Sequence, residues 1–544
     1  MIQVSRQYKE AVYAPTRRAK AKVDFEILDN EAYNDNTSIV TGEAPISRKS
    51  QLTNKKRNMD HKYATFEKDY FKLDGSFYIS PKPDEGNSEL GWWSDDISDE
   101  NGVFTSYQIL EFNFTEEHNS MGLTITFDTM ANEYASDFDI EIYRLDGTLI
   151  HKEEVTGNDN PLYVLIKGLD NYGRIVITIK KWAKPYRRAR VAEIDFGVIQ
   201  EYQDDKIIKL NMIEEMNIIS DKIPSNEIKF TIDNKSKEFN ILNPEGFYRF
   251  LKERQEVQAS IGVEVRENEF EYIPMGKFYL TDWQSDEGAL TASFTARDVF
   301  ELLESIDYKE SLTNTNLYDL VEDVLTKANV KDYFIDEGLK NIPTNGFTKS
   351  LNSRKALQYI GIAGKAAVYQ CRQGILQIKQ FKVLDKQDTQ YVYFAGPDMF
   401  CGMIYPMADE GYDMKNITFD NIYNEPQIKL DKLLYSLVMV VNNGEEKQEV
   451  TFYNEGIKEG SSFKVDNPLI NSIEHAEDVA KWIIEEYNLR AVYSINWRQN
   501  PCLECGDIVL VEDSYDAKKL SRITKQEFEY AGYLGGKTET KGGV

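Results

Sequence analysis

The chain has 544 residues, of which 41% are hydrophobic, and a formal net charge of −27 at pH 7. At about 100–200 residues per domain, this length predicts roughly three to five domains with cores of their own. The negative charge repels DNA phosphates and anionic lipid surfaces, which argues against a nucleic-acid-binding role. Two interpretations of the acidity stay open: a solvated surface that keeps a large protein soluble, or an acidic lining past which DNA slides.

The cysteines and the hydropathy pattern also exclude classes of protein. Four cysteines in 544 residues do not make a disulfide scaffold, so we expect folding in a reducing compartment. No apolar run approaches the roughly 20 residues that span a bilayer. The opening MIQVSRQYKE lacks the apolar core of a secretory signal. We therefore expect a protein that is made in the cytosol and has no membrane span.

Strand signals dominate the first part of the chain, and aromatic residues, at 12%, favour strands throughout. Residues 19–28 alternate polar and apolar side chains, as a strand does. Residues 29–60 are polar and are expected to form an exposed arm that ends in a basic run. In 71–80, Asp74-Gly75 stands between apolar runs and predicts a hairpin turn.

Residues 101–200 have the pattern of a β-sandwich. Six or seven short apolar runs are separated by turn residues, without a helical period between them. Asp146-Gly147 predicts one of the hairpins.

After residue 206 the strands resume, and helices appear among them. A short helix is predicted over 243–255, with Asn243 as its cap. Apolar residues at helical spacing predict helices over 316–330 and 353–367. Because strand patterns accompany these two helices, the region is expected to be a small α+β domain.

The C-terminal part is predicted to contain a hairpin, a helix and further strands. Asn443-Gly444 is a strong hairpin signal inside 435–453. Residues 473–489 form an amphipathic pattern, and strands follow to residue 530. The glycine-containing end, 536–544, is expected to be mobile.

No motif predicts catalysis, and no catalytic, metal or cofactor residue is assigned. G-x-S-x-G, Walker A and G-x-G-x-x-G motifs are absent from the sequence. Cys502 and Cys505 form a C-x-x-C without a second pair nearby, so packing is favoured over zinc or redox chemistry. A pair of catalytic carboxylates cannot be recognised from sequence. The four histidines show no metal-ligand spacing: His61, His118, His151 and His475.

The segment GWWSDDISDENGVF, residues 91–104, is the most unusual local sequence. Trp92 and Trp93, followed by four acidic residues, have the composition of a carbohydrate contact with a nearby cation. The alternative is that the two rings pack against a neighbouring part of the chain. We favour packing, and both interpretations stay open.

Three stretches together resemble a known family. Residues 64–104 resemble tail proteins of phages of Gram-positive bacteria. Residues 273–298 contain G-x-F-x-L-x-D and A-R-D phrases similar to those of the first barrel of the phage baseplate-hub or tail-associated family. Residues 466–513 resemble its second barrel, in which N-P opens a helix and a P-x-L-x-x-G-D phrase leads into a strand. Here that phrase is Pro501, Leu503, Gly506 and Asp507.

The resemblance implies a mainly β fold with α+β parts. It contains two hub-type β-barrels, an inserted discoidin-like, galactose-binding-type sandwich and a small α+β domain. The expected domains are a discontinuous first barrel with its arm (1–100 and 201–308), the sandwich (101–200), the α+β domain (309–427), the second barrel (428–535) and a mobile tail (536–544).

The function implied by the resemblance is structural and not enzymatic. It is a hub subunit of a phage tail tip, made in the host cytoplasm and assembled into the virion tail. The expected partners are two further copies in a homotrimeric ring, the tail tube or distal tail ring, and the tape-measure protein, without stable nucleic-acid binding. The run Lys55, Lys56 and Arg57 is expected to meet an acidic neighbouring subunit. The alternative is an adhesin whose sandwich binds a host cell-wall glycan.

Overall fold

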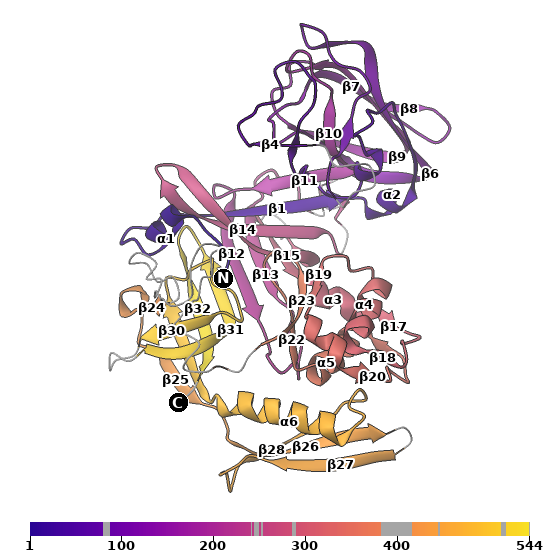
Figure 1. Cartoon of the computed structure of the whole chain (residues 1–544). Helices are drawn as coiled ribbons and strands as arrows, with labels where there is room; N and C mark the ends of the chain where they lie inside the picture. The colour runs from indigo at the N-terminus through magenta and orange to yellow at the C-terminus, as the bar shows by residue number, and fades with distance from the viewer. Residues whose placement is uncertain are drawn as a thin grey trace. The chain divides into compact units, whose positions relative to one another are not determined.

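The computed structural model shows a mainly β chain that divides into two compact units (Figure 1). Unit 1 comprises Met1–Asp24, Glu201–Asn240 and Glu256–Val544, and unit 2 comprises Phe25–Gln200 and Ile241–Gln255. The structure describes the chain except residues 80–87, 241, 244–249, 252–253, 286–289, 382–383, 385–415, 444–445, 513–517 and 543–544. The predicted helix over 243–255 lies largely outside the described residues, as does Cys401.

Unit 2 is built on a seven-stranded sheet in the order β5-β10-β6-β9-β7-β8, with β2 also pairing β6. The two longest strands, β6 and β9, pair with each other along most of their length and form the middle of the sheet. Alternate side chains of β7 are buried, as expected for a strand with one face on a core. The strands of this sheet are β2 (Asn36–Val40), β5 (Trp92–Trp93), β6 (Val103–Phe127), β7 (Ala135–Tyr143), β8 (Leu149–Val155), β9 (Leu162–Trp182) and β10 (Arg190–Asp195).

The unit starts well before the predicted sandwich. Its main segment ends at Gln200, the predicted boundary, but begins at Phe25, and two strands of its sheet precede residue 101. The Asp146-Gly147 hairpin is confirmed by the pairing of β7 with β8. The Asp74-Gly75 hairpin is wrong, because β4 pairs β3 in parallel. The smaller elements of this unit are α2 (Asn30–Asp35), η1 (Lys49–Gln51), β3 (Lys62–Tyr63) and β4 (Phe77–Tyr78).

One 13-stranded sheet has most of its residues in unit 1, in the order β11-β1-β14-β15-β16-β13-β12-β31-β32-β29-β25. Strand β30 pairs β31, and β24 pairs β30. The strands are β1 (Ala19–Leu28), β11 (Gly197–Tyr202), β12 (Ile207–Glu215), β13 (Glu227–Asp233), β14 (Glu256–Arg266), β15 (Glu269–Gln284), β16 (Thr291–Arg297), β24 (Asn416–Ile417), β25 (Gln427–Leu430), β29 (Ala491–Trp497), β30 (Ile508–Glu512), β31 (Lys518–Tyr530) and β32 (Leu534–Gly542).

This sheet corrects the expectation of two barrels. Strand β12 pairs β31, so strands assigned to the first and second barrels form a single sheet. In the described part of the chain no sheet closes on itself, since the path ends at β11 and β25. The mobile tail is also corrected, because residues 536–542 belong to β32 and pair with β29 and β31. The remaining domain boundaries stay a prediction.

The predicted α+β region contains the helices α4 and α5 with small strands around them, and the short helix α3 precedes it. The helix predicted over 316–330 is α4 and that over 353–367 is α5, whose cap is Asn352. Their apolar faces are part of the main core of unit 1. The elements are α3 (Val299–Glu304), β17 (Asp307–Tyr308), β18 (Thr315–Asn316), α4 (Leu317–Lys327), β19 (Tyr333–Ile335), η3 (Glu337–Asn341), β20 (Pro343–Thr344), β21 (Leu351–Asn352), α5 (Ser353–Ala363), β22 (Ala366–Gln370) and β23 (Leu376–Gln380).

A helix and a three-stranded sheet form the next layer of this unit (Figure 1). The hairpin predicted at Asn443-Gly444 is confirmed by the pairing of Asn443 with Glu446. The amphipathic helix is α6, which starts at its cap Ser472 and packs on β26. The elements are β26 (Leu434–Asn443), β27 (Glu446–Tyr453), β28 (Ser461–Asp466) and α6 (Ile473–Asn488); η4 (Phe419–Asn421) precedes them and α1 (Arg6–Val12) lies near the N-terminus.

Candidate interaction surface

A loop of unit 2 exposes several large apolar side chains. Within residues 64–79, Phe66, Leu73 and Ile79 have relative exposures of 110%, 94% and 89%. Phe71 and Tyr78 of the same loop are also exposed. Soluble proteins expose apolar clusters mainly where they meet another surface, so this loop, hereafter the apolar loop, is a candidate interaction surface.

Buried ion pairs hold the apolar loop in place. The carboxylate of Glu67 pairs with the guanidinium of Arg190, and both side chains are inaccessible to solvent. The backbone N–H of Arg188 donates to the same carboxylate at 2.6 Å. Arg187 donates to the carbonyl oxygens of Lys68 and Asp69. The backbone of residues 67–69 is therefore fixed, while the neighbouring apolar side chains face solvent.

Arg190 is the centre of this anchor. Besides Glu67 it pairs with Glu133 at 3.5 Å. Its guanidinium lies 4.4 Å from the ring centroid of Tyr70 and 4.2 Å from that of Trp93. Two carboxylates and two aromatic faces compensate the cost of burying the charge. Burial raises the pKa of the Tyr70 hydroxyl, and the positive charge of Arg190 opposes that shift.

The structure places Trp92 and Trp93 in the interior. Both side chains are buried, and their ring N–H groups donate to the carbonyl oxygens of Gly42 and Leu90 at 3.1 and 2.7 Å. Neither ring presents a face on which a sugar could stack. This geometry agrees with the packing interpretation. The ring of Trp93 also packs against the guanidinium of Arg190.

The basic run, predicted as a subunit contact, makes contacts inside unit 2. Arg57 pairs with Asp195 at 2.9 Å and with Glu26 at 2.5 Å. The Lys55 ammonium donates to Asn30 at 2.6 Å. The Lys56 side chain is 62% exposed and lies 3.9 Å from the carboxylate of Glu89. Arg57 is therefore committed to internal pairs, whereas most of the Lys56 side chain stays exposed.

The C-x-x-C pair lies in the core of unit 1. Cys502 and Cys505 are buried free thiols. Burial raises the pKa of Cys502 to about 12 and that of Cys505 well above its ordinary value, so neither thiol is an activated nucleophile. Gly506 makes the turn with φ +94°, a conformation that side chains disfavour.

A buried arginine fixes this turn, which carries the P-x-L-x-x-G-D phrase. Arg372 pairs with Glu214 at 2.7 Å and donates to the carbonyl oxygens of Pro501 and Leu503. Burial raises the pKa of Glu214, and Arg372 opposes the shift. The charges are therefore structural ones that hold the turn against β12.

The histidines also take local roles. His118 lies 2.8 Å from Asp35 and 3.4 Å from Asp29, His151 lies 3.2 Å from Glu153, and His475 Nε2 lies 2.8 Å from the carbonyl oxygen of Ala363. His61 stacks on Tyr78 of the apolar loop, with centroids 3.9 Å apart. In the part of the chain that the structure describes, no group of three or more His, Cys, Asp or Glu residues is arranged to hold a metal ion.

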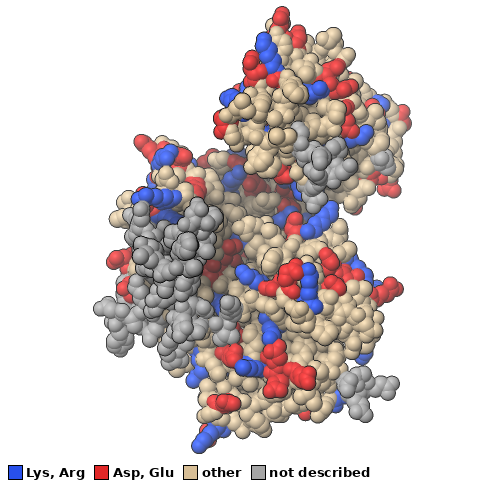
Figure 2. Space-filling model, in the orientation of Figure 1, with Lys and Arg blue, Asp and Glu red and all other residues tan. Residues whose placement is uncertain are grey.

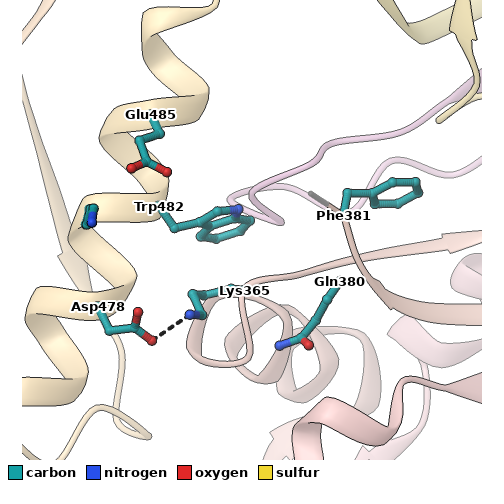
Figure 3. Close-up of a pocket in the computed structure, with 7 residues that line it drawn as sticks. Lys365, Gln380, Phe381, Asp478, Trp482 and Glu485 are labelled. Carbon is teal, nitrogen blue, oxygen red and sulfur yellow. Dashed lines mark ion pairs between the residues drawn. The ribbon is translucent and has the colours of Figure 1, made fainter. Parts of the chain in front are cut away.

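A cleft of about 310 Å³ lies between α6 and the β22–β23 region of unit 1 (Figure 3). The Lys365 ammonium pairs with Asp478 across it at 2.6 Å. The cleft's lining contains no serine, cysteine or histidine, so it holds no Ser–His or Cys–His pair of nucleophile and base. The lining residues are Lys365, Gln380, Phe381, Asp478, Lys481, Trp482 and Glu485.

The apolar residues of this loop follow a pattern that predicted a hairpin and not an exposed surface. The segment FKLDGSFYIS, residues 71–80, predicted strands around a hairpin turn at Asp74-Gly75. Asp74 instead accepts a hydrogen bond from the Ser76 N–H at 3.0 Å in a local turn. The anchor was not visible, because Arg190 is more than 120 residues from Glu67 in sequence.

The outer surface is acidic but mixed. On the face drawn in Figure 2, outside the grey residues, Lys and Arg side chains are interspersed with Asp and Glu and form no large basic patch. Among the described helices, none combines the length and the apolar composition that crossing a membrane requires.

Comparison with known proteins gives matches only among solved structures. No family model and no curated protein matches the chain. It is similar to a tail protein from Neisseria meningitidis MC58, with 10% identity, a TM-score of 0.42, and coverage of 63% of this chain and 93% of that chain. It is also similar to the 43 kDa tail protein of prophage MuSo2 from Shewanella oneidensis, with 10% identity, a TM-score of 0.41, and coverage of 63% and 95%.

A third likeness concerns a smaller part of the chain. Chitosan-binding module 1 of a chitosanase/glucanase from Paenibacillus sp. IK-5 is 12% identical, with a TM-score of 0.19, and the match covers 30% of this chain and 96% of that module. At these identities and TM-scores, none of the three likenesses decides the function of this chain.

Proposed function

We propose that the chain is a structural subunit of a phage tail, and in particular of the hub at its tip. The observation that carries the proposal is the apolar loop. Large apolar side chains are exposed on a loop whose residues 67–69 are held by a buried ion pair and by hydrogen bonds from buried arginines, which suits an attachment surface. It opens the stretch 64–104, which resembles phage tail proteins.

The hub phrases support the same proposal through their positions. The G-x-F-x-L-x-D and A-R-D phrases lie on β15 and at the end of β16, and the P-x-L-x-x-G-D phrase precedes β30. These strands belong to one sheet. A large continuous scaffold of this kind suits a protein that acts by assembly.

In the proposed assembly, three copies form a ring that joins the tail tube to the tip. The tape-measure protein and then DNA pass through the ring, whose acidic surface repels DNA phosphates. The number three comes from the resemblance. The carbohydrate-binding alternative loses its two aromatic candidates, since Trp92 and Trp93 are buried.

Co-expression with the tail proteins encoded beside this chain tests the proposal. We expect a complex that contains three copies of the chain, by native mass measurement, and threefold symmetry in electron micrographs. A complex with one or two copies, or a ring without threefold symmetry, contradicts the hub assignment. Absence of any complex with tail proteins contradicts the wider proposal.

A further inference from the structure

Strand β25 (Gln427–Leu430) forms one end of the unit 1 sheet. It pairs with β29 on one side, and no other described strand pairs with it. All four of its residues are exposed, with Ile428 at 58% and Leu430 at 52%. An open edge with apolar side chains is a site at which another chain readily adds a strand.

The register shows which backbone groups face the open edge. The N–H of Asp431 donates to the carbonyl oxygen of Arg490 at 2.9 Å. In an antiparallel pair, hydrogen-bonded residues alternate with residues whose N–H and C=O point away from the partner. Lys429, two residues before Asp431, therefore bonds toward β29. The N–H and C=O groups of Ile428 and Leu430 point outward.

The two faces of β25 differ in chemistry. Ile428 stands opposite Tyr493 and Leu430 opposite Ala491, and both partners are buried in the core. The apolar core side of β29 thus continues onto β25, where it is exposed. The other face carries Lys429.

Positive charge gathers on and beside this strand. Neither Lys429 nor the exposed Lys432 that follows it forms an ion pair with another described residue. Asp431, between them, lies 3.8 Å from the ammonium of Lys541. By strand alternation Asp431 lies on the same face as Lys429, but its charge is matched by Lys541. A strand that adds to this edge is therefore favoured if it brings negative charge to Lys429.

We propose that β25 is a docking edge for an extended segment of another protein, with apolar side chains at alternate positions and acidic side chains between them. Such a segment pairs with the outward groups of Ile428 and Leu430, covers the exposed apolar face and places carboxylates near Lys429. A second copy of β25 fits less well, because the carboxylate it would bring to Lys429, that of Asp431, already lies 3.8 Å from the ammonium of Lys541. The inference goes beyond the proposed function, since it depends only on the geometry and the charge of this edge.

Amide hydrogen exchange of the full chain tests whether the edge is open. We expect the amides of Ile428 and Leu430 to exchange rapidly, while those of Lys429 and Asp431 are protected by β29. Protection of Ile428 and Leu430 in the free protein would mean that the chain already covers its own edge, and would overturn the proposal.

Binding of short peptides tests the chemistry of the occupant. The probes are fluorescent peptides of alternating Glu and Val, and of alternating Lys and Val, followed by anisotropy. We expect the acidic peptide to bind. The basic peptide should bind at least about tenfold more weakly, because its lysines are repelled by Lys429. Equal binding of the two peptides, or no binding of either, overturns the proposal.

Variants separate the edge from other binding sites. Ile428→Pro removes an outward N–H without removing a bond to β29, and is expected to abolish peptide binding at unchanged melting temperature. Ile428→Val keeps the N–H and is the matched control that still binds. Lys429→Glu leaves the backbone intact and is expected to reverse the preference of the two peptides. Concentration-dependent dimerisation of the wild type that Ile428→Pro abolishes would instead identify a second copy as the occupant.

Discussion

Arg190 is a fully buried charge, and its removal leaves the buried carboxylate of Glu67 without its counter-charge, whereas Glu133 keeps Lys184 at 3.3 Å and Arg187 at 3.4 Å. We expect Arg190→Met to lower the free energy of unfolding of this unit by about 3–5 kcal/mol, the usual effect of breaking a buried ion pair. Urea denaturation followed by tryptophan fluorescence measures it, since Trp93 lies against Arg190.

Arg174 provides the matched control for that measurement. Its guanidinium also stacks on an aromatic ring, 4.2 Å from the centroid of Tyr143, but it is not fully buried. Arg174→Met is expected to cost about 1 kcal/mol or less. Equal losses in the two variants would show that the buried anchor is not specially stabilising.

Asp298, the last residue of the A-R-D phrase, caps α3 and has a buried carboxylate. It accepts hydrogen bonds from Ser225, Asn226 and Phe300, yet burial raises its pKa to about 6. A raised folded-state pKa stabilises the fold at low pH, and this contribution is lost as pH rises through about 6.

Asp298→Asn should remove this pH dependence. The stability of the wild type relative to the variant is expected to fall by up to about 3 kcal/mol between about pH 4 and pH 7, from a shift of roughly two pKa units. Denaturation at several pH values measures the difference. A difference that stays constant with pH, or increases, would contradict the assignment.

At the scale of elements, the apolar loop separates binding from stability. Replacing Phe66, Leu73 and Ile79 together by serine should change the free energy of unfolding of unit 2 by about 0.5 kcal/mol or less per residue, because these side chains are exposed. Binding to a neighbouring tail protein should be lost. Co-purification of wild type and variant with that protein checks the second effect.

A buried residue of the same loop gives the opposite outcome. Tyr70→Ser removes a ring that lies against Arg190 and Arg187, so it should lower the stability of unit 2 by about 3–5 kcal/mol. If the triple serine variant were equally unstable, the loop would be part of the core and would not be a preformed surface.

Local patterns predicted elements well where the partner strand is close in sequence. Asn443-Gly444 and Asp146-Gly147 each mark a hairpin that forms. Asp74-Gly75 has the same chemistry but makes only a local turn, because β4 pairs with β3 from the preceding side of the loop. A turn signal specifies the turn and does not specify which strands pair.

Features that depend on distant partners could not be predicted. The glycine-containing segment from 536 has a weak strand pattern, yet it forms β32 because β29 and β31 provide hydrogen bonds on both sides. The burial of Trp92 and Trp93 depends equally on residues far along the chain, such as Arg190. Composition therefore identified the unusual tryptophan pair but could not choose between packing and an exposed contact.

For the whole molecule, the charge predicts no binding to duplex DNA. The basic run Lys55, Lys56 and Arg57 offers little, because Arg57 is held by Asp195 and Glu26. Few phosphates could then be neutralised, and counterion release would add little free energy. Anisotropy of labelled duplex DNA should stay constant on addition of the protein from low to physiological salt.

A basic DNA-binding protein under the same conditions is the control for this titration. Tight binding that weakens steeply with salt would show a phosphate-binding surface and would contradict an acidic passage for DNA.

The pairing of β12 with β31 sets the order in which the chain folds. Residues 210–215 pair with residues that the ribosome adds more than 300 positions later. Before β31 is synthesised, β12 can pair with β13 on one side only. Its other edge stays open, and the β12–β31 pairing is missing from the sheet. Contacts of such long range form slowly and leave intermediates prone to wrong pairing. The nascent chain therefore depends on protection during synthesis, and its yield should be sensitive to chaperone supply and to growth temperature.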